Sequence, residues 1–398
     1  MPRLPGFAAI LSPGAAPPLT AGSIWPVPVV VFSALLIAWA AEVAEFFVSQ
    51  GLALAVLAFL QVLPEFAVEA AIAHNAAQNP SLIGLVTANF TGSNRLLVGV
   101  GLPLVFFLAA FAARRRRERF RAIELRPGHS VEVLFLLIPT AYMAVPYLRG
   151  ALGLVDSAVL ASIFGLYLWI LGRLPPEPRG AAEVVPGVAG FVLTKSARVQ
   201  KSFVLGGFLG GGLLLFLAAE PFLGAMMGVA AALGISTFFF VQWIAPALSE
   251  FPEFIAASRW AVQVRAATPA LVNILSAKVN QWTLLVAMIP MVFSISLGRN
   301  ADVPLGDIHG VQRVELLLTA AQSVAAVAIF LKMRMTALDA GLLFGLWFFQ
   351  FVEPGLREEM IPVYLAFAVF EVVRHRKELR LLRDFREVLR SHAVRRPA

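Results

Sequence analysis

The chain has 398 residues, of which 59% are hydrophobic and 14% are charged, and its net charge is +8. Its mean hydropathy of +0.81 lies outside the range of soluble globular domains and indicates an integral membrane protein. The absence of cysteine excludes disulfides, thiol catalysis and cysteine metal sites.

Apolar runs of about 20 residues are long enough to cross a bilayer as helices, and the chain has eleven such runs. In chain order they cover residues 24–48, 51–75, 83–112, 131–148, 152–172, 203–225, 228–257, 269–297, 312–332, 337–352 and 359–373. Residues 1–23 form a Pro-, Gly- and Ala-rich N-terminal segment without the pattern of a cleavable signal peptide.

The basic segments predict the orientation of these spans. They are "RRRRERFR" (114–121), the linker 173–202, "LKMRM" (331–335) and the tail 374–398. Counting eleven spans places all four on the same side, which the positive-inside rule assigns to the cytoplasm. We therefore expect a multi-pass protein of the plasma (inner) membrane, with the N-terminus outside and the C-terminus cytoplasmic. The positive charge then reports loop topology, and no nucleic-acid partner is expected.

The basic tail also carries an apolar stripe. Leu379, Leu382, Phe385 and Leu389 recur at helical spacing among basic residues. Such a helix can lie on an anionic membrane surface, and a solvated helical tail is the alternative. The lipid bilayer is the expected partner, and the sequence does not give an oligomeric state.

Four pairs of similar segments follow the same order in the two halves of the chain. They are "AAEVAEFF" (40–47) with "LAAEPFLG" (217–224), "LPEF" (63–66) with "FPEF" (251–254), "VEVLF" (131–135) with "VELLL" (314–318), and "LVDSAVL" (154–160) with "ALDAGLL" (337–343). Each half holds five spans, an odd number, so the second copy is upside down relative to the first. Inverted repeats of this kind build secondary transporters.

The pattern predicts an all-α integral membrane fold of two inverted five-helix repeats (5+5). The predicted repeats are residues 24–172 and 203–352, on either side of the linker 173–202. Residues 353–373 add an extra C-terminal transmembrane helix, which is followed by the basic tail 374–398.

A Pro-Glu pair recurs at matching positions within two apolar runs. Pro64 and Pro252 break the backbone hydrogen bonds of their helices, and Glu65 and Glu253 follow at once. A charged residue at the bilayer centre costs roughly 2.5 kcal/mol or more, so intramembrane acids usually serve a function. Binding of an ion or proton is one interpretation, and a structural ion pair with a basic side chain is the other.

The segments around these acids resemble a known family. The first repeat has "LQVLPE" (60–65) and then "ANFTGSN" (88–94), and the second has "LSEFPE" (248–253) and then "VNILSAK" (272–278). The chain is similar here to the cation/calcium exchanger superfamily, which includes the sodium/calcium exchangers. In that superfamily each inverted repeat carries G-T-S-x-P-E and then G-N-x-x-G-S-N. The resemblance extends over about residues 30–352.

The resemblance implies a set of cation ligands. Glu65 and Glu253 are the expected paired acids that bind the transported calcium or related cation. Asn89 and Asn273 are the expected amide ligands, and interhelical hydrogen bonding is their alternative role. Carboxylate and amide oxygens are the ligands that calcium prefers.

The sequence also departs from the family pattern. Gln61 and Val62 replace a Thr and a Ser in the first repeat, Lys278 replaces the last Asn in the second, and Arg95 follows the first G-S-N. The further candidate site or coupling residues are Glu69, Ser93, Asn94, Ser249, Glu250, Lys278 and Arg95. A buried ammonium near acids can replace a bound cation or can titrate. Altered stoichiometry, proton coupling and internal salt bridges all remain open.

The expected function is secondary active antiport of the sodium/calcium exchanger type. Calcium or a related cation would move against sodium or protons as the first and sixth helices move past a fixed core. The alternative is a divergent exchanger-fold protein in which Lys278 and Arg95 fill the ion sites. Such a protein would be proton-coupled with another substrate or would not transport at all. No enzyme activity and no cofactor beyond the transported ions is expected, since neither a nucleophile–base pair nor a phosphate-binding loop stands out.

Overall fold

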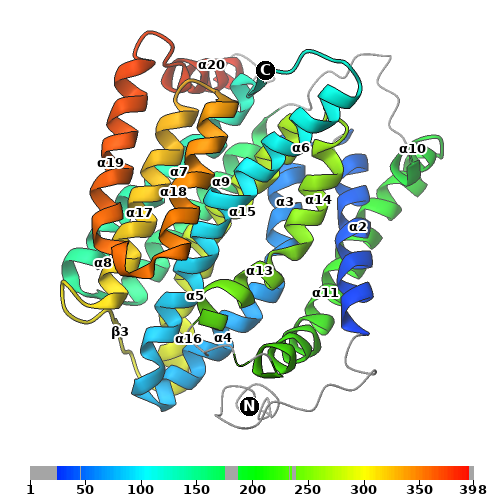
Figure 1. Ribbon diagram of the computed structural model, residues 1–398. Coiled ribbons are helices and arrows are strands. Elements are labelled where there is room, and N and C mark those ends of the chain that lie inside the picture. The colour runs from blue at the N-terminus through cyan, green and yellow to red at the C-terminus, as the bar shows by residue number, and fades with distance from the viewer. Residues whose placement is uncertain (1–24, 45, 175–186, 233, 235–238, 394–398) are drawn as a thin grey trace.

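The apolar runs fold into helices that stand side by side in one bundle (Figure 1). The computed structural model describes residues 25–44, 46–174, 187–232, 234 and 239–393, so the predicted N-terminal segment 1–23 lies outside the described residues. Seven of the described helical stretches are long and apolar enough to cross a membrane. They are Pro26–Ala44, Pro80–Arg115, Pro127–Arg149, Leu154–Arg173, Ala197–Ala218, Ala267–Leu297 and Val311–Phe330. The fold is therefore the all-α membrane fold that the composition predicts.

The elements of the first half are, in chain order, α2 (Pro26–Ala44), α3 (Gln50–Gln61), α4 (Leu63–Gln78), η2 (Pro80–Leu82), α5 (Ile83–Leu96), η3 (Leu97–Gly101), α6 (Leu102–Arg115), β1 (Ala122–Glu124), η4 (Pro127–His129), α7 (Ser130–Tyr142), α8 (Ala144–Arg149), β2 (Ala151–Leu152) and α9 (Leu154–Arg173). Those of the second half are α10 (Gly187–Leu193), α11 (Ala197–Ala232), η5 (Phe240–Ile244), α13 (Ala245–Ser249), α14 (Phe251–Ala261), α15 (Ala267–Asn280), η6 (Gln281–Leu285), α16 (Val286–Leu297), β3 (Val303–Pro304), α17 (Val311–Phe330), β4 (Arg334–Thr336), α18 (Ala337–Val352), η7 (Pro354–Leu356), α19 (Arg357–Arg374) and α20 (Leu381–Ala393).

Two helices break at the Pro-Glu pairs. After the first break α4 begins at Leu63, and after the second α14 begins at Phe251. The proline lies in the first turn of each new helix, where its missing N–H leaves no hydrogen bond unmade. The breaks predicted at Pro64 and Pro252 are therefore confirmed.

The next long helical stretch after α4, and the next after α14, each contain a wider, π-helical turn. η3 interrupts the first of these helices from Leu97, and η6 interrupts the second from Gln281, at matching positions of the two predicted repeats. A π turn inserts one extra residue and often marks a functional site. Together with the paired breaks, the paired π turns support the predicted internal repeat.

Two short antiparallel sheets tie the halves of the chain together. β1 pairs with β4 (Ile123 opposite Met335), and β2 pairs with β3 (Leu152 opposite Val303). Since β1 precedes α7 and β2 follows α8, the sheets lie at opposite ends of that helical stretch. In each sheet, a loop before the fourth helix of one predicted repeat pairs with a loop after the fourth helix of the other. This exchange is what an inverted arrangement requires.

Glycines let α11 lie directly against α2. A Cβ added at Gly207 would be 2.6 Å from the Cβ of Ala40, and one added at Gly211 would be 2.5 Å from Cγ1 of Ile37. Small residues allow helices to approach closely within a membrane, where packing drives their association. The first helices of the two predicted repeats therefore form a tightly packed pair.

The structure corrects one predicted boundary. The predicted spans 203–225 and 228–257 require a turn at 226–227, but α11 continues without interruption to Ala232. The run beyond 225 contains no proline, and its small apolar residues sustain a helix. The chain turns further on, near Gly234, whose φ of 69° suits a residue without a side chain.

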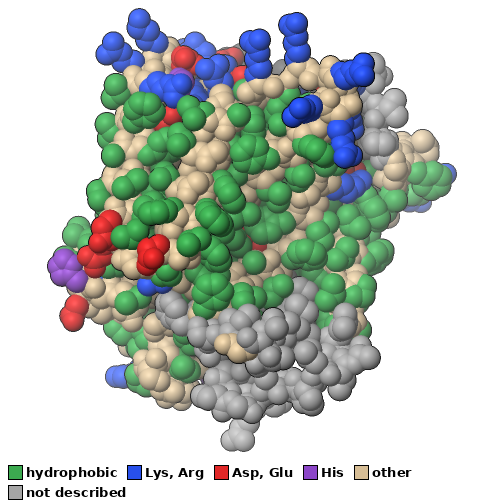
Figure 2. Space-filling model, viewed as in Figure 1, with side chains coloured by type: hydrophobic (Ala, Val, Ile, Leu, Met, Phe, Trp, Pro, Cys, Tyr) green, Lys and Arg blue, Asp and Glu red, His purple; other side chains and the backbone are tan. Residues whose placement is uncertain are grey.

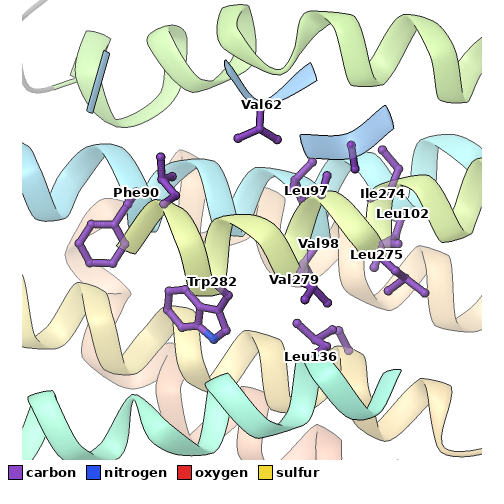
Figure 3. Close-up of a cluster of buried hydrophobic side chains, with 14 of the residues drawn as sticks. Val62, Phe90, Leu97, Val98, Leu102, Leu136, Ile274, Leu275, Val279 and Trp282 are labelled. Atoms are coloured by element: carbon purple, nitrogen blue, oxygen red, sulfur yellow. The ribbon is translucent and has the colours of Figure 1, made fainter. Parts of the chain in front are cut away.

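The centre of the bundle is an apolar contact between the halves. Figure 3 shows side chains of α5, η3 and α6 facing those of α15 and η6. Trp282 is fully buried there, and its Nε1 donates to Oγ1 of Thr140 at 3.0 Å. The helical stretches α5–η3–α6 and α15–η6–α16 thus pack against each other at the centre of the bundle.

Lys and Arg side chains gather at one end of the bundle, above an apolar band (Figure 2). The side chain of Arg116 donates to the carbonyl oxygens of Val262 and Gln263, and the N–H of Arg380 donates to the carbonyl oxygen of Leu331. These contacts bring basic segments from distant parts of the sequence to the same end.

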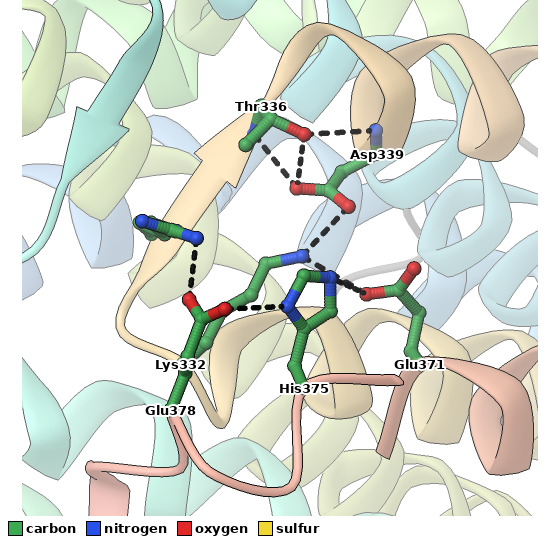
Figure 4. Close-up of polar contacts among 7 residues, drawn as sticks. Lys332, Thr336, Asp339, Glu371, His375 and Glu378 are labelled. Atoms are coloured by element: carbon green, nitrogen blue, oxygen red, sulfur yellow. Dashed lines mark hydrogen bonds and ion pairs between the residues drawn. The ribbon is translucent and has the colours of Figure 1, made fainter. Parts of the chain in front are cut away.

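A buried charge cluster at this end holds α19 against the rest of the bundle (Figure 4). Nζ of Lys332 lies 2.8 Å from Oδ1 of Asp339 and 2.9 Å from Oε2 of Glu371. His375 lies 3.6 Å from the same Glu371 oxygen, and its Nδ1 contacts Glu378 at 3.3 Å. The hydrogen bond from His375 holds the pKa of the Glu378 carboxyl below its usual value. The ion pairs of Lys332, which follows α17, thus connect α19 with α18.

Within the basic tail, Leu381–Ala393 form α20, next to η4 and α7, and the predicted stripe residue Leu379 lies before this helix. In the predicted apolar stripe, Phe385 packs against the core, whereas Leu379, Leu382 and Leu389 are exposed. The amphipathic helix is therefore present, and its contact with anionic lipid stays a prediction.

Candidate functional site

The helix breaks place the two predicted acids at the starts of helices. Glu65 lies in the first turn of α4 and Glu253 in the first turn of α14. Both side chains are buried, with relative exposures of 1% and 0%. A helix N-terminus presents free N–H groups and a partial positive charge, which favour an acidic side chain there.

Glu65 meets Glu250 across the two halves of the chain. Nε2 of Gln281 donates to Oε2 of Glu65 at 2.6 Å and to Oε1 of Glu250 at 3.1 Å. The hydroxyl of Ser93 donates to the same Glu250 oxygen at 2.5 Å. Side chains of α4, α5, η6 and the residue between α13 and α14 thus converge on one buried polar centre.

A close backbone contact allows this convergence. A Cβ added at Gly92 would be 1.9 Å from the carbonyl oxygen of Gln242, so only glycine fits where α5 crosses η5. This crossing brings the neighbouring Ser93 to Glu250. The close approach of α5 to η5 therefore explains why position 92, in the first G-S-N segment, is a glycine.

The structure groups four of the predicted acids. Glu65 interacts electrostatically with Glu69, Glu250 and Glu253. All four side chains are at most 1% exposed. Neither carboxylate oxygen of Glu253 has a hydrogen-bond partner on another described residue. Four buried carboxyl groups in one region are unusual, because each needs a counter charge or a proton.

The predicted amide ligands lie beside this group. Nδ2 of Asn89 donates to Oε2 of Glu69 at 2.6 Å, rather than to Glu65. Nδ2 of Asn273 lies 3.4 Å from Oε1 of Gln61, and its Oδ1 has no hydrogen-bond partner among the described residues. Both amides are buried, and the hydrogen bonds of their Nδ2 atoms go to Glu69 and Gln61 instead of Glu65 and Glu253.

The two predicted bases occupy different surroundings. Nζ of Lys278 donates to the carbonyl oxygen of Asn94 at 3.1 Å and to its Oδ1 at 2.9 Å, and lies 4.8 Å from the ring of Trp282. Its charge also acts on Glu65 and Glu250 through space. The ammonium group is therefore part of the centre, held by neutral oxygens.

Arg95 instead points to a second buried cluster. Its guanidinium pairs with Glu315 of α17 and lies 4.9 Å from the ring of Trp243. Glu315 also binds Arg357 of α19 at 2.8 Å and Gln242 of η5 at 2.7 Å. This cluster joins α5, η5, α17 and α19, so Arg95 acts here as a link between helices.

Ser249 also turns away from the centre. Its hydroxyl donates to the carbonyl oxygen of Pro246 at 3.1 Å, within its own helix.

Sequence reasoning missed Gln281 and Glu315. Gln281 lies two helical turns beyond Asn273, outside the segment that resembles the family. Glu315 lies within the repeated segment 314–318, but nothing in that pattern indicated a basic partner. A polar residue in an apolar membrane helix was the available signal for both.

The centre is not a preformed metal cage. Among the described residues, no three His, Cys, Asp or Glu side chains are close enough together to hold a metal ion. Calcium prefers six to eight oxygens, from amides, carbonyls and water as well as carboxylates. A cation at this centre would therefore need amide or backbone oxygens in addition to the acids.

Comparison with known proteins agrees with this architecture. The family model described as sodium/calcium exchanger protein matches the chain twice, over residues 24–173 and 203–352. The crystal structure of the H+/Ca2+ exchanger CAX is similar with a TM-score of 0.79 and 32% sequence identity, covering 95% of this chain and 93% of that one. No curated protein sequence matches the chain.

Structures of the sodium-calcium exchanger NCX_Mj share the fold at lower identity. The form soaked with 100 mM Na+ and 10 mM Sr2+ has a TM-score of 0.59 and 17% identity, and it covers 83% of this chain and 97% of that one. The form soaked with 10 mM Na+ and zero Ca2+ has a TM-score of 0.60, the same identity and the same coverage. The family matches extend over more than half of the chain. The chain therefore belongs to the sodium/calcium exchanger family, and it is a multi-pass membrane cation antiporter rather than an enzyme.

Proposed function

We propose that the protein exchanges calcium for protons across the plasma (inner) membrane. The observation that carries this proposal is the group of four buried carboxyls, Glu65, Glu69, Glu250 and Glu253, in which Glu65 acts electrostatically on each of the other three and shares the amide of Gln281 with Glu250. Lys278 is the basic side chain whose charge acts on two of these acids, Glu65 and Glu250.

The charge balance of this group supports proton coupling. Burying an uncompensated carboxylate is costly, so each carboxyl must carry a proton or face a cation. A calcium ion that enters between two of the acids can replace two protons and leave the net charge of the centre unchanged. Protons that return from the other side then release the calcium. One set of side chains thus serves both ions in turn.

Two further observations support protons over sodium. The H+/Ca2+ exchanger CAX shares 32% identity over 95% of this chain, whereas the NCX_Mj structures, at 17%, support the fold alone. In addition, the oxygens of Asn94 bind the Lys278 ammonium, where they could otherwise bind a monovalent cation. A tethered ammonium cannot be transported, so this position adds no sodium to the exchange.

The gathering of basic segments at one end supports the proposed orientation. This end carries the Lys and Arg side chains seen in Figure 2, and the positive-inside rule assigns it to the cytoplasm. The N-terminus then lies outside and the C-terminus inside. Two inverted repeats, 24–172 and 203–352, would alternate access as α2 and α11 move past the central helices.

Calcium uptake into proteoliposomes tests the proposal. We expect uptake driven by a pH gradient and not by a sodium gradient. Glu253→Gln should abolish it, because the amide cannot release a proton. Glu359→Gln, at an exposed acid in the first turn of α19, is the matched control and should transport normally. Uptake driven only by sodium would contradict proton coupling.

The alternative is that the basic residues have replaced the ion sites. Lys278 favours this alternative, because its Nζ occupies the oxygens of Asn94, whereas the ion pair of Arg95 with Glu315 places that guanidinium apart from the four acids. The alternative predicts no uptake under either gradient and no stabilisation of the folded protein by calcium. Lys278→Asn separates the roles of Lys278, since a freed site should introduce sodium dependence.

A further inference from the structure

The side chain of Gln281 bridges the two acids that come from different halves of the chain. It is fully buried at the start of the π turn η6. Its Nε2 lies 2.6 Å from Oε2 of Glu65 and 3.1 Å from Oε1 of Glu250. A single nitrogen therefore joins the carboxyls of the two predicted repeats.

This amide is satisfied on one side only. Its nitrogen carries two hydrogens, and each has an acid as its acceptor. Its Oε1 is buried and has no hydrogen-bond partner among the described residues. A buried acceptor left unpaired is unfavourable, so native proteins usually give it a partner, a water or a function.

A cation between Glu65 and Glu250 cannot tolerate the present orientation of the amide, because the N–H groups would point at a positive charge. Rotation about the last side-chain torsion exchanges Nε2 and Oε1 within nearly the same volume, and this torsion is soft. After rotation, the unpaired oxygen becomes a ligand. Amide oxygens are normal calcium ligands, and the acids alone do not form a complete site here.

We propose that Gln281 is a ligand of the transported cation and that its amide alternates between two orientations. In the cation-free state its N–H groups hold Glu65 and Glu250 together. In the cation-bound state its Oε1 joins their oxygens around the ion. This inference rests on the proposed calcium transport, and it assigns to this residue a role that differs from those of the acids.

Calcium titration of the purified full-length protein, by calorimetry in detergent, tests the role of Gln281. Gln281→Met keeps the volume and removes both polar atoms, so we expect calcium binding at least tenfold weaker. Gln281→Glu removes the donor but keeps oxygen ligands, so it should bind calcium at least as tightly as the unchanged protein. Gln322→Met is the matched control. Gln322 is also a buried glutamine with one unpaired amide oxygen, but its Nε2 donates to the carbonyl of Arg95, and its loss should leave calcium affinity unchanged.

The outcomes separate this inference from the proposed function. If the unchanged protein binds calcium and Gln281→Met binds it equally well, Gln281 is not a ligand although calcium remains the substrate. If Gln281→Glu binds calcium as weakly as Gln281→Met, the N–H groups of Gln281 matter for binding and its amide oxygen does not. The proposed alternation of the amide would then be wrong. If the unchanged protein binds no calcium, both the inference and the proposed function fail. Thermal unfolding of each variant checks that weaker binding reflects the site and not misfolding.

Discussion

The glycine contact between α2 and α11 gives a sharp prediction, because adjacent glycines on α11 face different surroundings. A Cβ at Gly207 would lie 2.6 Å from the Cβ of Ala40, whereas a Cβ at Gly206 would meet nothing within 4 Å. An alanine side chain cannot rotate away. In Gly207→Ala the two helices must therefore separate by about 1 Å to restore an ordinary carbon–carbon contact of about 3.5–4.0 Å.

The expected free energies follow from these contacts. Overpacking a well-packed interface destabilises the folded protein by about 1–3 kcal/mol. Replacing glycine by alanine within a helix stabilises it by about 0.5–1 kcal/mol. Gly206→Ala has the stabilising effect of alanine in a helix without the cost of overpacking, because its Cβ meets nothing within 4 Å. We therefore expect Gly207→Ala to be less stable than Gly206→Ala by about 1–3 kcal/mol, with a lower unfolding midpoint in the same detergent.

Transport should follow the same order if α2 and α11 move as one packed pair. Gly206→Ala should take up calcium at the normal rate, and Gly207→Ala should be slower at equal amounts of folded protein. Equal stability and equal transport of the two variants would refute the close packing and the paired movement together.

Three further predictions concern buried groups. Glu65→Gln should abolish calcium uptake driven by a pH gradient while leaving a folded protein, as measured by flux and size-exclusion chromatography; normal flux would remove Glu65 from the site. Lys332→Met leaves two buried carboxylates without their ammonium and should cost about 3–5 kcal/mol in denaturant unfolding, so unchanged stability would show that the cluster is dispensable. Gly92→Ala should prevent stable folding, since its Cβ meets a backbone carbonyl, whereas Gly341→Ala, in open space, should fold normally by thermal unfolding.

Local rules explain why the sequence predicted part of the site. Proline within a helix breaks it wherever the helix packs, so the starts of α4 and α14 could be read from Pro64 and Pro252. The free-energy cost of burying an acid in a membrane is equally general. It indicates that Glu65 and Glu253 serve a function even without knowledge of their contacts. Both inferences depend only on neighbouring residues and on the apolar surroundings.

Contacts between helices could not be predicted in the same way. Whether Arg95 points to the acids or to Glu315 depends on how α5 is rotated in the bundle, and a single sequence does not give this rotation. The position of Gln281 against Glu65 depends on how far two helices slide past each other. The end of α11 was misplaced for a related reason, since small apolar residues mark neither a turn nor a helix end.

The contact between Lys278 and Asn94 makes the two halves of the chain unequal at the centre of the bundle. These residues occupy the same position in the two aligned segments, and they touch each other at the centre of the bundle. With asparagine at both positions, each half would offer oxygens to a mobile cation. With lysine at one position, its Nζ donates to both the carbonyl oxygen and the Oδ1 of the asparagine at the other, so neither oxygen is free for a mobile cation. Under the proposed calcium–proton exchange, this position then offers no site to a second transported cation, and Lys278→Asn is the variant that tests whether it does.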